Sequence, residues 1–333
     1  MRLRLRVVPA CLAPLGYLRR RRRLLTSWPA ADRLADMALE PRVALFCHYD
    51  RTGAANPAVL AYLSALRAAG FCPVVICNAG RLQADALAAL RGVAGAVLLR
   101  ANSGHDFGAW AEALHRLCLP RPDTQAVLLA NDSVLGPIGA LGPLFDRLDL
   151  GTADVWGLTD STQWHWHLQS YFLLAGRRAL TSAAWRDFWA GVRPVPSKQW
   201  TVWQGEIALS RRLTAAGLKL AAAWPSAALL AGLDQTALAR LGASGGPAPE
   251  AIYARRLLAA ALGGPPINPT TDLWQALLNE GFPFLKRELL RDDPGRTGAA
   301  TTWRAAVAAR GSVDPAVLQA MAAEAGETEA GET

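Results

Sequence analysis

Short apolar strand patterns alternate with amphipathic helix patterns from Val43 onward, and this alternation most constrains the fold. The strand patterns are VALFCHYD from residue 43, FCPVVICNAG from 71, GAVLLR from 95 and AVLLA from 126. Helix patterns lie between them at 57–70, 84–90 and 107–117, and the first is opened by Asn56-Pro57 and closed by Gly70. Strands that alternate with helices predict an α/β fold with a parallel sheet and right-handed crossovers.

The strand ends are candidate site positions, because ligands of such sheets bind beyond the carboxyl ends of the strands. Three of these ends are polar where their strands are apolar, at 47–50, 100–106 and 131–133. In the last of them Asp132 either forms a turn or helix cap, or binds a divalent cation, Mg²⁺ or Mn²⁺, that bridges ligand phosphates. Asn131 is neutral, which leaves one carboxylate where two are more common.

The segment RANSGHDFGAW places Asn102, Gly104 and Asp106 before a helix pattern. Gly104 allows the backbone to approach a ligand closely, and Asp106 either accepts a hydrogen bond from a ribose hydroxyl or caps the helix. The segment has no Walker-A lysine and no GxGxxG run, so the P-loop and dinucleotide-binding fingerprints are both absent.

Two further segments carry groups suited to sugar chemistry. In QWHWHLQSYF, His165 and His167 alternate with two Trp, which suits either sugar stacking and hydrogen bonding or plain packing. Glu206 heads the helix pattern EIALSRRLTAAG, where the helix dipole favours an acid with or without a function as general base. The sequence lacks a nucleophile elbow and a His-Glu metalloprotease helix, which argues against a hydrolase.

Charge is concentrated at the N-terminus. Eight of the 35 basic residues are Arg within the first 23 positions, and the other 310 residues carry 27 basic and 27 acidic side chains. The body is therefore not expected to bind nucleic acid. The Arg-rich start is a disordered tail, a contact with anionic lipid at the cytoplasmic membrane face, or an over-extended start, and its apolar run is too short to span a bilayer. Five Cys without a CxxC pair predict free thiols in a reducing compartment.

Composition divides the chain into four parts. Residues 1–40 are the basic segment, and residues 41–241 are the α/β domain. Residues 242–295 contain a linker, GASGGPAP, and a helical extension. Residues 296–333 form an Ala/Glu-rich tail that is expected to be partly disordered, above all in the final GETEAGET.

Several of these runs together resemble a known family. RANSGHDFGAW, LLANDSVLGP, ADVWGLTDS, HLQSYFLLAG and EIALSRRLTAAG occur in the order found in the rhamnan synthesis F family of bacterial polysaccharide glycosyltransferases, and NPTTDLWQALLNEGFPFLKRELLRDDP resembles its C-terminal signature. The resemblance runs from about residue 41 to 294. It implies a GT-A-like, Rossmann-like glycosyltransferase domain with a mostly helical C-terminal extension.

The resemblance also implies roles for individual residues. A nucleotide-diphosphate sugar would be bound by the strand ends, through Tyr49, Asp50, Asn102, Gly104, Asp106, Asn131, Asp132 and Ser133. Asp132 would hold the divalent cation and Glu206 would be the catalytic base, while His167, Gln169 and Ser170 are candidates for the sugar or acceptor side. Family-two transferases usually have Asp after the base, and here Ile207 follows Glu206.

The expected function is an inverting transfer of rhamnose or a related sugar to a lipid-linked or growing cell-surface polysaccharide, at the cytoplasmic face of the membrane. Lys286, Arg287 and Arg291 would meet lipid phosphates or simply form a solvated charged face. Two alternatives stay open: a non-catalytic carbohydrate-binding or assembly subunit that keeps the fold, and a retaining transferase that needs no base at Glu206.

Overall fold

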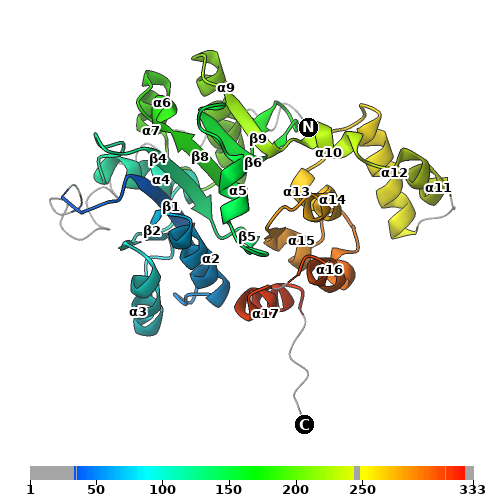
Figure 1. The fold of residues 1–333 in the computed structure, drawn as a ribbon, viewed down its shortest axis with the longest axis horizontal. Coiled ribbons are helices and arrows are strands. Elements are labelled where there is room, and N and C mark those ends of the chain that lie inside the picture. Colours follow the sequence, from blue (N-terminus) through cyan, green and yellow to red (C-terminus); the bar gives the residue numbers. More distant parts are fainter. Residues whose placement is uncertain (1–33, 35, 244–247, 312, 327–333) are drawn as a thin grey trace, which may run out of the picture.

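The structure is a computed structural model that describes residues 34, 36–243, 248–311 and 313–326. Within these residues eight strands form one central sheet in the order β3-β2-β1-β4-β8-β6-β7, and β9 also pairs with β6 (Figure 1). The strands of the sheet are β1 (Arg42–His48), β2 (Cys72–Cys77), β3 (Ala96–Leu99), β4 (Ala126–Asn131), β6 (Val155–Ser161), β7 (His167–Leu168), β8 (Phe172–Gly176) and β9 (Leu220–Trp224).

Strands β1 to β4 are parallel, as the alternation predicts. β1 lies between β2 and β4, with Cys47 opposite both Ile76 and Asn131. Every residue of β2 and β4 is buried, as in strands that are covered on both faces. β8 is antiparallel to β4 and β6, because residues 162–171 return the chain through the short β7 and not through a crossover helix. The α/β prediction is confirmed, and the sheet is mostly parallel.

Alternate residues of each strand point to opposite faces of the sheet. Val43 and Leu45 pack with residues of α4, α7 and α9, whereas Ala44 and Phe46 pack with residues of α2, α3 and α5. The helices of this part are α2 (Pro57–Ala68), α3 (Ala84–Val93), α4 (His105–Arg116), α5 (Gly142–Arg147), α6 (Arg177–Leu180), α7 (Ala183–Gly191), α8 (Lys198–Trp200), the π-helix η2 (Thr201–Ile207) and α9 (Ala208–Ala215).

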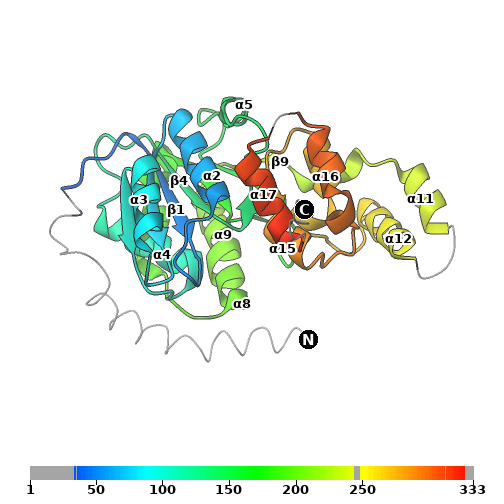
Figure 2. The same ribbon diagram turned by 90° about the horizontal axis from the view of Figure 1, so that it is seen from below.

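The C-terminal part is mostly helical, as predicted, and lies to the same side of the sheet in both views (Figures 1 and 2). Its elements are α10 (Ser226–Ala231), α11 (Gln235–Ala243), α12 (Pro249–Ala261), α13 (Pro269–Asp272), α14 (Trp274–Asn279), β10 (Leu285–Lys286), α15 (Arg287–Arg291), α16 (Ala299–Ala308) and α17 (Pro315–Glu324). β10 pairs in antiparallel fashion with β5 (Val134–Leu135), the short strand that follows β4.

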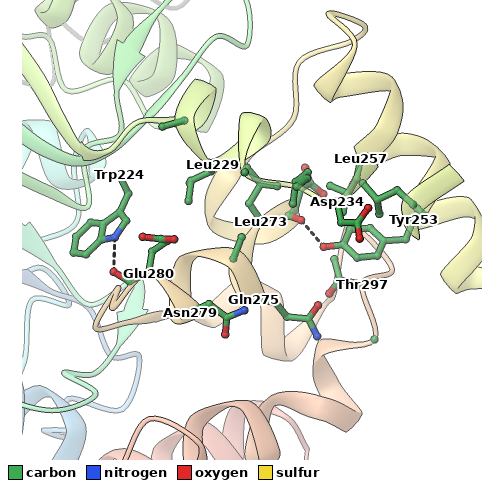
Figure 3. A pocket seen from close by; sticks show the side chains of 18 of the residues that line it. Trp224, Leu229, Asp234, Tyr253, Leu257, Leu273, Gln275, Asn279, Glu280 and Thr297 are labelled. Carbon is green, nitrogen blue, oxygen red and sulfur yellow. Dashed lines mark hydrogen bonds between the residues drawn. The ribbon is translucent and has the colours of Figure 1, made fainter. Parts of the chain in front are cut away.

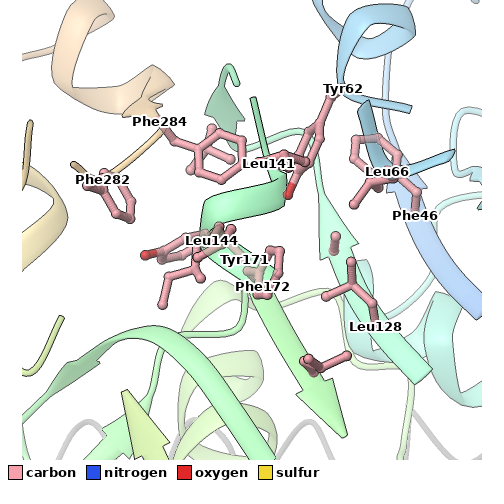
Figure 4. Close-up of a cluster of buried hydrophobic side chains, with 14 of the residues drawn as sticks. Phe46, Tyr62, Leu66, Leu128, Leu141, Leu144, Tyr171, Phe172, Phe282 and Phe284 are labelled. Atoms are coloured by element: carbon pink, nitrogen blue, oxygen red, sulfur yellow. The ribbon is translucent and has the colours of Figure 1, made fainter. Parts of the chain in front are cut away.

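Aromatic side chains of the C-terminal part pack into the hydrophobic core of the sheet domain (Figure 4). The ring of Phe284 lies 4.8 Å from that of Tyr62, and the ring of Phe282 lies 6.4 Å from that of Tyr171. Residues on both sides of the expected boundary at 241 therefore share one hydrophobic cluster.

Several predictions fall on the edges of the described ranges. Most of the basic segment, linker residues 244–247 and nearly all of GETEAGET lie outside them. Of the described cysteines, Cys47, Cys72 and Cys77 are buried and Cys118 is exposed, and all four are free thiols as expected. Every helix in the described ranges is too short or too polar to cross a lipid bilayer.

Candidate active site

The carboxyl ends of β1 to β4 meet at one edge of the sheet, and buried polar side chains lie there. Arg100 donates from Nε to a carboxylate oxygen of Glu112 at 3.0 Å and from Nη1 to Oδ1 of Asn78. Asn78 in turn donates to Oδ1 of Asn102 at 3.3 Å. The buried guanidinium therefore ties the ends of β2 and β3 together, and its charge is paired within the protein.

Asp132 is held by the end of β1. Its Oδ2 lies 2.7 Å from Nδ1 of His48 and accepts a hydrogen bond from the backbone N–H of Tyr49 at 3.1 Å. Nε2 of His48 lies 3.0 Å from the carbonyl oxygen of Ala54, so both ring nitrogens face acceptors and only the imidazolium donates to both. Burial lowers the pKa of His48, but the hydrogen bond and charge of Asp132 outweigh burial, and the pKa lies above its ordinary value. Asp132 thus lies in the turn between β4 and β5, as one alternative predicted, and is the partner of the buried His48 and not a helix cap.

Asn131 has a defined role as a neutral residue. Its amide nitrogen donates to Oδ2 of Asp106 at 2.7 Å, and its Oδ1 accepts from the N–H and hydroxyl of Ser133 at 3.1 and 2.6 Å. Burial raises the pKa of Asp106. Hydrogen bonds from Cys47 and Asn131 oppose this rise, but the pKa stays above its ordinary value. A carboxylate at position 131 would repel Asp106, whereas the amide joins it to the end of β4. We call His48, Asp106, Asn131 and Asp132 the strand-end cluster.

The structure gives other predicted donor residues local partners. Oδ1 of Asp50 accepts from the N–H and hydroxyl of Thr52, which shapes the loop after β1, and Tyr49 is exposed. Gly104 is itself the N-cap of α4, so the alternative of Asp106 as the cap is wrong. A Cβ at Gly104 would lie 2.4 Å from Cα of Pro194, and its φ is 74°, so packing and conformation both require glycine there.

Glu206 lies in the π-helix η2 and not in the first turn of an α-helix, which corrects the sequence-based placement. Its Oε1 accepts from the hydroxyl and N–H of Ser170 at 2.5 and 3.3 Å, and its Oε2 lies 3.6 Å from Nε2 of His167. Burial raises the pKa of Glu206, but hydrogen bonds from His167 and Ser170 and the charges of His167 and Lys286 outweigh it, so the pKa is lowered. The carboxylate is therefore ionised and 19% exposed. We call Glu206, His167 and Ser170 the Glu206 cluster.

Of the residues predicted for the sugar or acceptor, two contact Glu206 and one does not. His167 is buried while His165 is exposed, so the two imidazoles do not share a face. Gln169 accepts from the hydroxyl of Thr159 at 2.6 Å and donates to Oδ1 of Asn268 at 3.1 Å. Gln169 therefore connects β7 and β6 to the C-terminal part.

Lys286 lies near both clusters, because the charges of Asp106 and Glu206 both act on it. Its Nζ donates to the hydroxyl of Ser133 at 3.0 Å and lies 4.9 Å from the ring centroid of Tyr171. Burial lowers its pKa, and the charges of Glu206, Glu288 and Asp106 oppose that effect. The alternative of a solvated charged face is wrong for Lys286, because its side chain is half-buried beside Ser133 and Tyr171. A contact of this segment with lipid phosphates stays a prediction.

The fit to a divalent cation is limited to one ligand. Among the described residues no three His, Cys, Asp or Glu side chains converge as a metal site. Oδ2 of Asp132 is engaged by His48 and Tyr49, and its Oδ1 has no hydrogen bond among the described residues. Asp132 therefore suits a single carboxylate ligand to a cation whose other ligands are phosphates and water, which is how Mg²⁺ is often bound.

Three members of the site were missed in the sequence. His48 stood in the quoted strand end CHYD, and its position beside Asp132 follows from the pairing of β1 with β4. Asn78 stood at the end of the second strand and carried the same signal. Lys286 is 153 residues from Ser133, and no local pattern connects the two.

The sequence of this chain is similar to that of known proteins. Residues 74–229 match the family model described as Rhamnan synthesis protein F. The match confirms the family resemblance and includes most of β2, all of β3 to β9 and Glu206, but not β1 or Lys286. A "Virulence protein VirA" of Vibrio anguillarum (strain ATCC 68554 / 775) is 28% identical over 199 residues, which are 59% of this chain and 62% of the relative. The alignment thus spans less than two thirds of that relative.

A solved structure is also similar, at a lower level. It is a mannosyltransferase from Pyrobaculum calidifontis in complex with GDP-Man and Mn²⁺, 16% identical, with 98% of this chain and 91% of that chain covered and a TM-score of 0.37. At this TM-score the likeness assigns no role to any residue here.

A cleft of about 820 Å³ is lined by other residues than those of the two clusters (Figure 3). It lies between the end of β9 and the helices of the C-terminal part. Trp224 lines it and donates from Nε1 to the carbonyl oxygen of Glu280 at 3.1 Å. None of the residues predicted for catalysis or donor binding lines this cleft.

Proposed function

We propose that this chain is a glycosyltransferase that moves rhamnose or a related sugar from a nucleotide-diphosphate donor to a growing cell-surface polysaccharide or lipid-linked acceptor, with inversion. The observation that carries the proposal is a polar strand-end cluster at the ligand-binding edge of the sheet, next to a lysine that interacts electrostatically with the ionised Glu206. The match to a polysaccharide-synthesis family supports it. In this proposal the α/β domain has a GT-A-like fold and the transfer takes place at the inner face of the membrane.

The strand-end cluster suits the nucleotide diphosphate. Tyr49, Asp50, Asn102 and Asp106 follow the ends of β1 and β3 and are assigned to the base and ribose. Asn131 and Ser133 are assigned to the diphosphate side, with Gly104 supporting the backbone. A divalent cation on Oδ1 of Asp132 would supply positive charge to the phosphates.

Glu206 suits proton abstraction. Its lowered pKa keeps it ionised, so that it can accept the proton of an acceptor hydroxyl. The acceptor oxygen then bonds to the anomeric carbon, the bond from that carbon to the phosphate oxygen breaks, and the electron pair leaves with the diphosphate. His167 and Ser170 fix the orientation of the carboxylate and act on the reaction through it.

Calorimetric titration of dTDP, UDP and GDP tests the donor site. We expect one nucleotide to bind wild type in the presence of Mg²⁺ or Mn²⁺, and Asp132→Ala to bind it about 10- to 100-fold more weakly there, because the carboxylate that would hold the cation is lost. The matched control is Asp123→Ala, an exposed aspartate that precedes β4 and lies at the opposite edge of the sheet. Titrations with and without Mg²⁺ or Mn²⁺ test the cation.

The same titrations separate the alternatives. If no nucleotide binds wild type under any condition, the proposal is wrong. If a nucleotide binds but no sugar is transferred to glycan acceptors, the non-catalytic subunit is favoured. The anomeric configuration of a product separates inversion from retention.

A further inference from the structure

Lys286 is fixed in place by backbone pairing. In β10 it lies opposite Val134 of β5, and Leu285 lies opposite Leu135. The N–H of Arg287 donates to the carbonyl oxygen of Ser133 at 3.1 Å. The backbone on both sides of the lysine is thus bound to the segment that directly follows Asp132, and Phe284 is 1% exposed in the core.

The ammonium of Lys286 is surrounded by acids without pairing closely with one. Asp106, Glu206 and Glu288 act on it electrostatically, and Lys198 is the nearby like charge. Its hydrogen bond is to the neutral hydroxyl of Ser133, and none of the ion pairs formed by the described residues includes it. A partly buried cation in this state is costly unless an anion completes it.

The other buried cations of the site already have partners. His48 is paired with Asp132, and Arg100 is paired with Glu112. The acids of the site, Asp106, Asp132 and Glu206, would by themselves repel a diphosphate. Arg51 and Arg81 are exposed near the ends of β1 and β2, so among the described residues Lys286 is the partly buried cation of the site that no acid pairs with.

We propose that Lys286 binds the diphosphate of the donor and stabilises its growing negative charge as the sugar departs. This rests on the proposed function and assigns its leaving-group residue. A lysine ammonium is a compact charge suited to phosphate oxygens, and β10 holds it next to Ser133 without a rearrangement of the backbone. As the sugar–phosphate bond breaks, the electron pair moves to a phosphate oxygen beside this charge.

Calorimetry in the presence of a chelator tests the assignment. Wild type, Lys286→Met and Lys286→Arg are titrated with the nucleoside diphosphate that binds best, its monophosphate and the free nucleoside. We expect wild type to prefer the diphosphate over the nucleoside by about 10- to 100-fold, and Lys286→Met to lose that preference while binding the nucleoside as before. Lys286→Arg should keep part of the preference.

Lys219→Met is the matched control. Lys219 is exposed and directly precedes β9, and its replacement by Met changes the net charge by the same amount as Lys286→Met. Its preference should equal that of wild type. A lysine that only attaches the C-terminal part would change the melting temperature and the affinity for all three ligands together.

Three results would overturn the inference. One is a folded Lys286→Met that keeps the full preference for the diphosphate. Another, which needs no variant, is a wild type that binds diphosphate and nucleoside equally in the chelator. Binding of the diphosphate to wild type only with Mg²⁺ or Mn²⁺ would also overturn the inference, because the cation and not Lys286 would then hold the diphosphate, whereas failure of every nucleotide to bind with or without the cation would remove the proposed function.

Discussion

In the strand-end cluster every described side chain is held by neighbours from the first 133 residues, whereas the Glu206 cluster and Lys286 are assembled from irregular elements far along the chain. Asp132 is fixed by His48, and Asn131 is fixed against Asp106, at the ends of paired parallel strands. Glu206 lies in a π-helix, and Lys286 comes from a two-residue strand. A rigid platform suits binding, and π-helical turns are common where a side chain does chemistry. Changes in the strand-end cluster or at Lys286 should therefore weaken nucleotide binding, whereas a change at Glu206 should lower turnover and leave nucleotide binding intact.

The largest expected effect is on turnover in Glu206→Gln. Loss of the general base should lower kcat by about 10²- to 10⁴-fold, while nucleotide affinity stays near that of wild type. Kinetic assays of sugar transfer and calorimetry of the same preparation measure the two quantities. A variant that loses nucleotide affinity and turnover equally would contradict the division between the two halves.

The next effect is on stability, in Phe284→Ala. Truncation of this buried ring should cost about 3–5 kcal/mol in unfolding free energy. Phe71→Ala is the matched control, since Phe71 is also fully buried but lies before β2, at the opposite edge of the sheet. Both variants should lose similar stability in urea denaturation, but only Phe284→Ala should weaken diphosphate binding, because only it frees the segment that carries Lys286. Equal diphosphate affinity in the two would show that β10 does not need the core to position its lysine.

A smaller effect is expected from pH. The pKa of Glu206 is lowered in the folded state, so its contribution to stability is present above about pH 4.3 and is lost as pH falls through the lowered value. The pKa of His167 is raised, so its contribution is present below about pH 6.5 and is lost as pH rises through the raised value.

The pH dependence of activity should reflect the same two groups, Glu206 and His167. The acid limb of kcat/KM should lie below the ordinary range of a glutamate, and His167→Gln should move it upward, since the imidazolium no longer favours the carboxylate. A pH–rate profile of both proteins measures this shift. An acid limb that does not move in the variant would mean that Glu206 does not set it.

The sequence predicted the first half of the site better than the second. Alternating strand and helix patterns located β1 to β4 and therefore the edge where Asp132, Asn131 and Asp106 meet. The partner of each could not be predicted, because the pairing of Asp132 with His48 depends on which strands are neighbours. The sequence suggests a helix cap for Asp106, but it does not indicate the hydrogen bond that Asp106 accepts from the side-chain amide of Asn131.

The second half depends on tertiary structure that local patterns do not contain. An acid before an apolar helical run predicts a first-turn position, but the π-helix places Glu206 one helix earlier and against Ser170. A Lys-Arg pair near acids resembles a solvated surface, and only the pairing of β10 with β5 brings Lys286 to Ser133. The antiparallel β8 likewise follows from a short return that the strand pattern did not distinguish from a crossover.

The smallest effects come from two Asn-Pro helix starts that share a local motif. Oδ1 of Asn56 accepts from the N–H of Ala58 at 2.8 Å, and Oδ1 of Asn268 accepts from the N–H of Thr270 at 3.2 Å. Asn56→Ala should therefore cost about 1 kcal/mol of unfolding free energy and leave turnover unchanged.

Asn268 differs because its Oδ1 also accepts from Nε2 of Gln169, one residue before Ser170. Asn268→Ala should cost more stability than Asn56→Ala and should also lower kcat by several-fold, because loss of the Gln169 contact loosens the hydroxyl that orients Glu206. Thermal denaturation and transfer kinetics on the two variants measure both differences. If the two variants had the same kcat, the contact of Asn268 with Gln169 would stabilise the fold without affecting the orientation of Glu206.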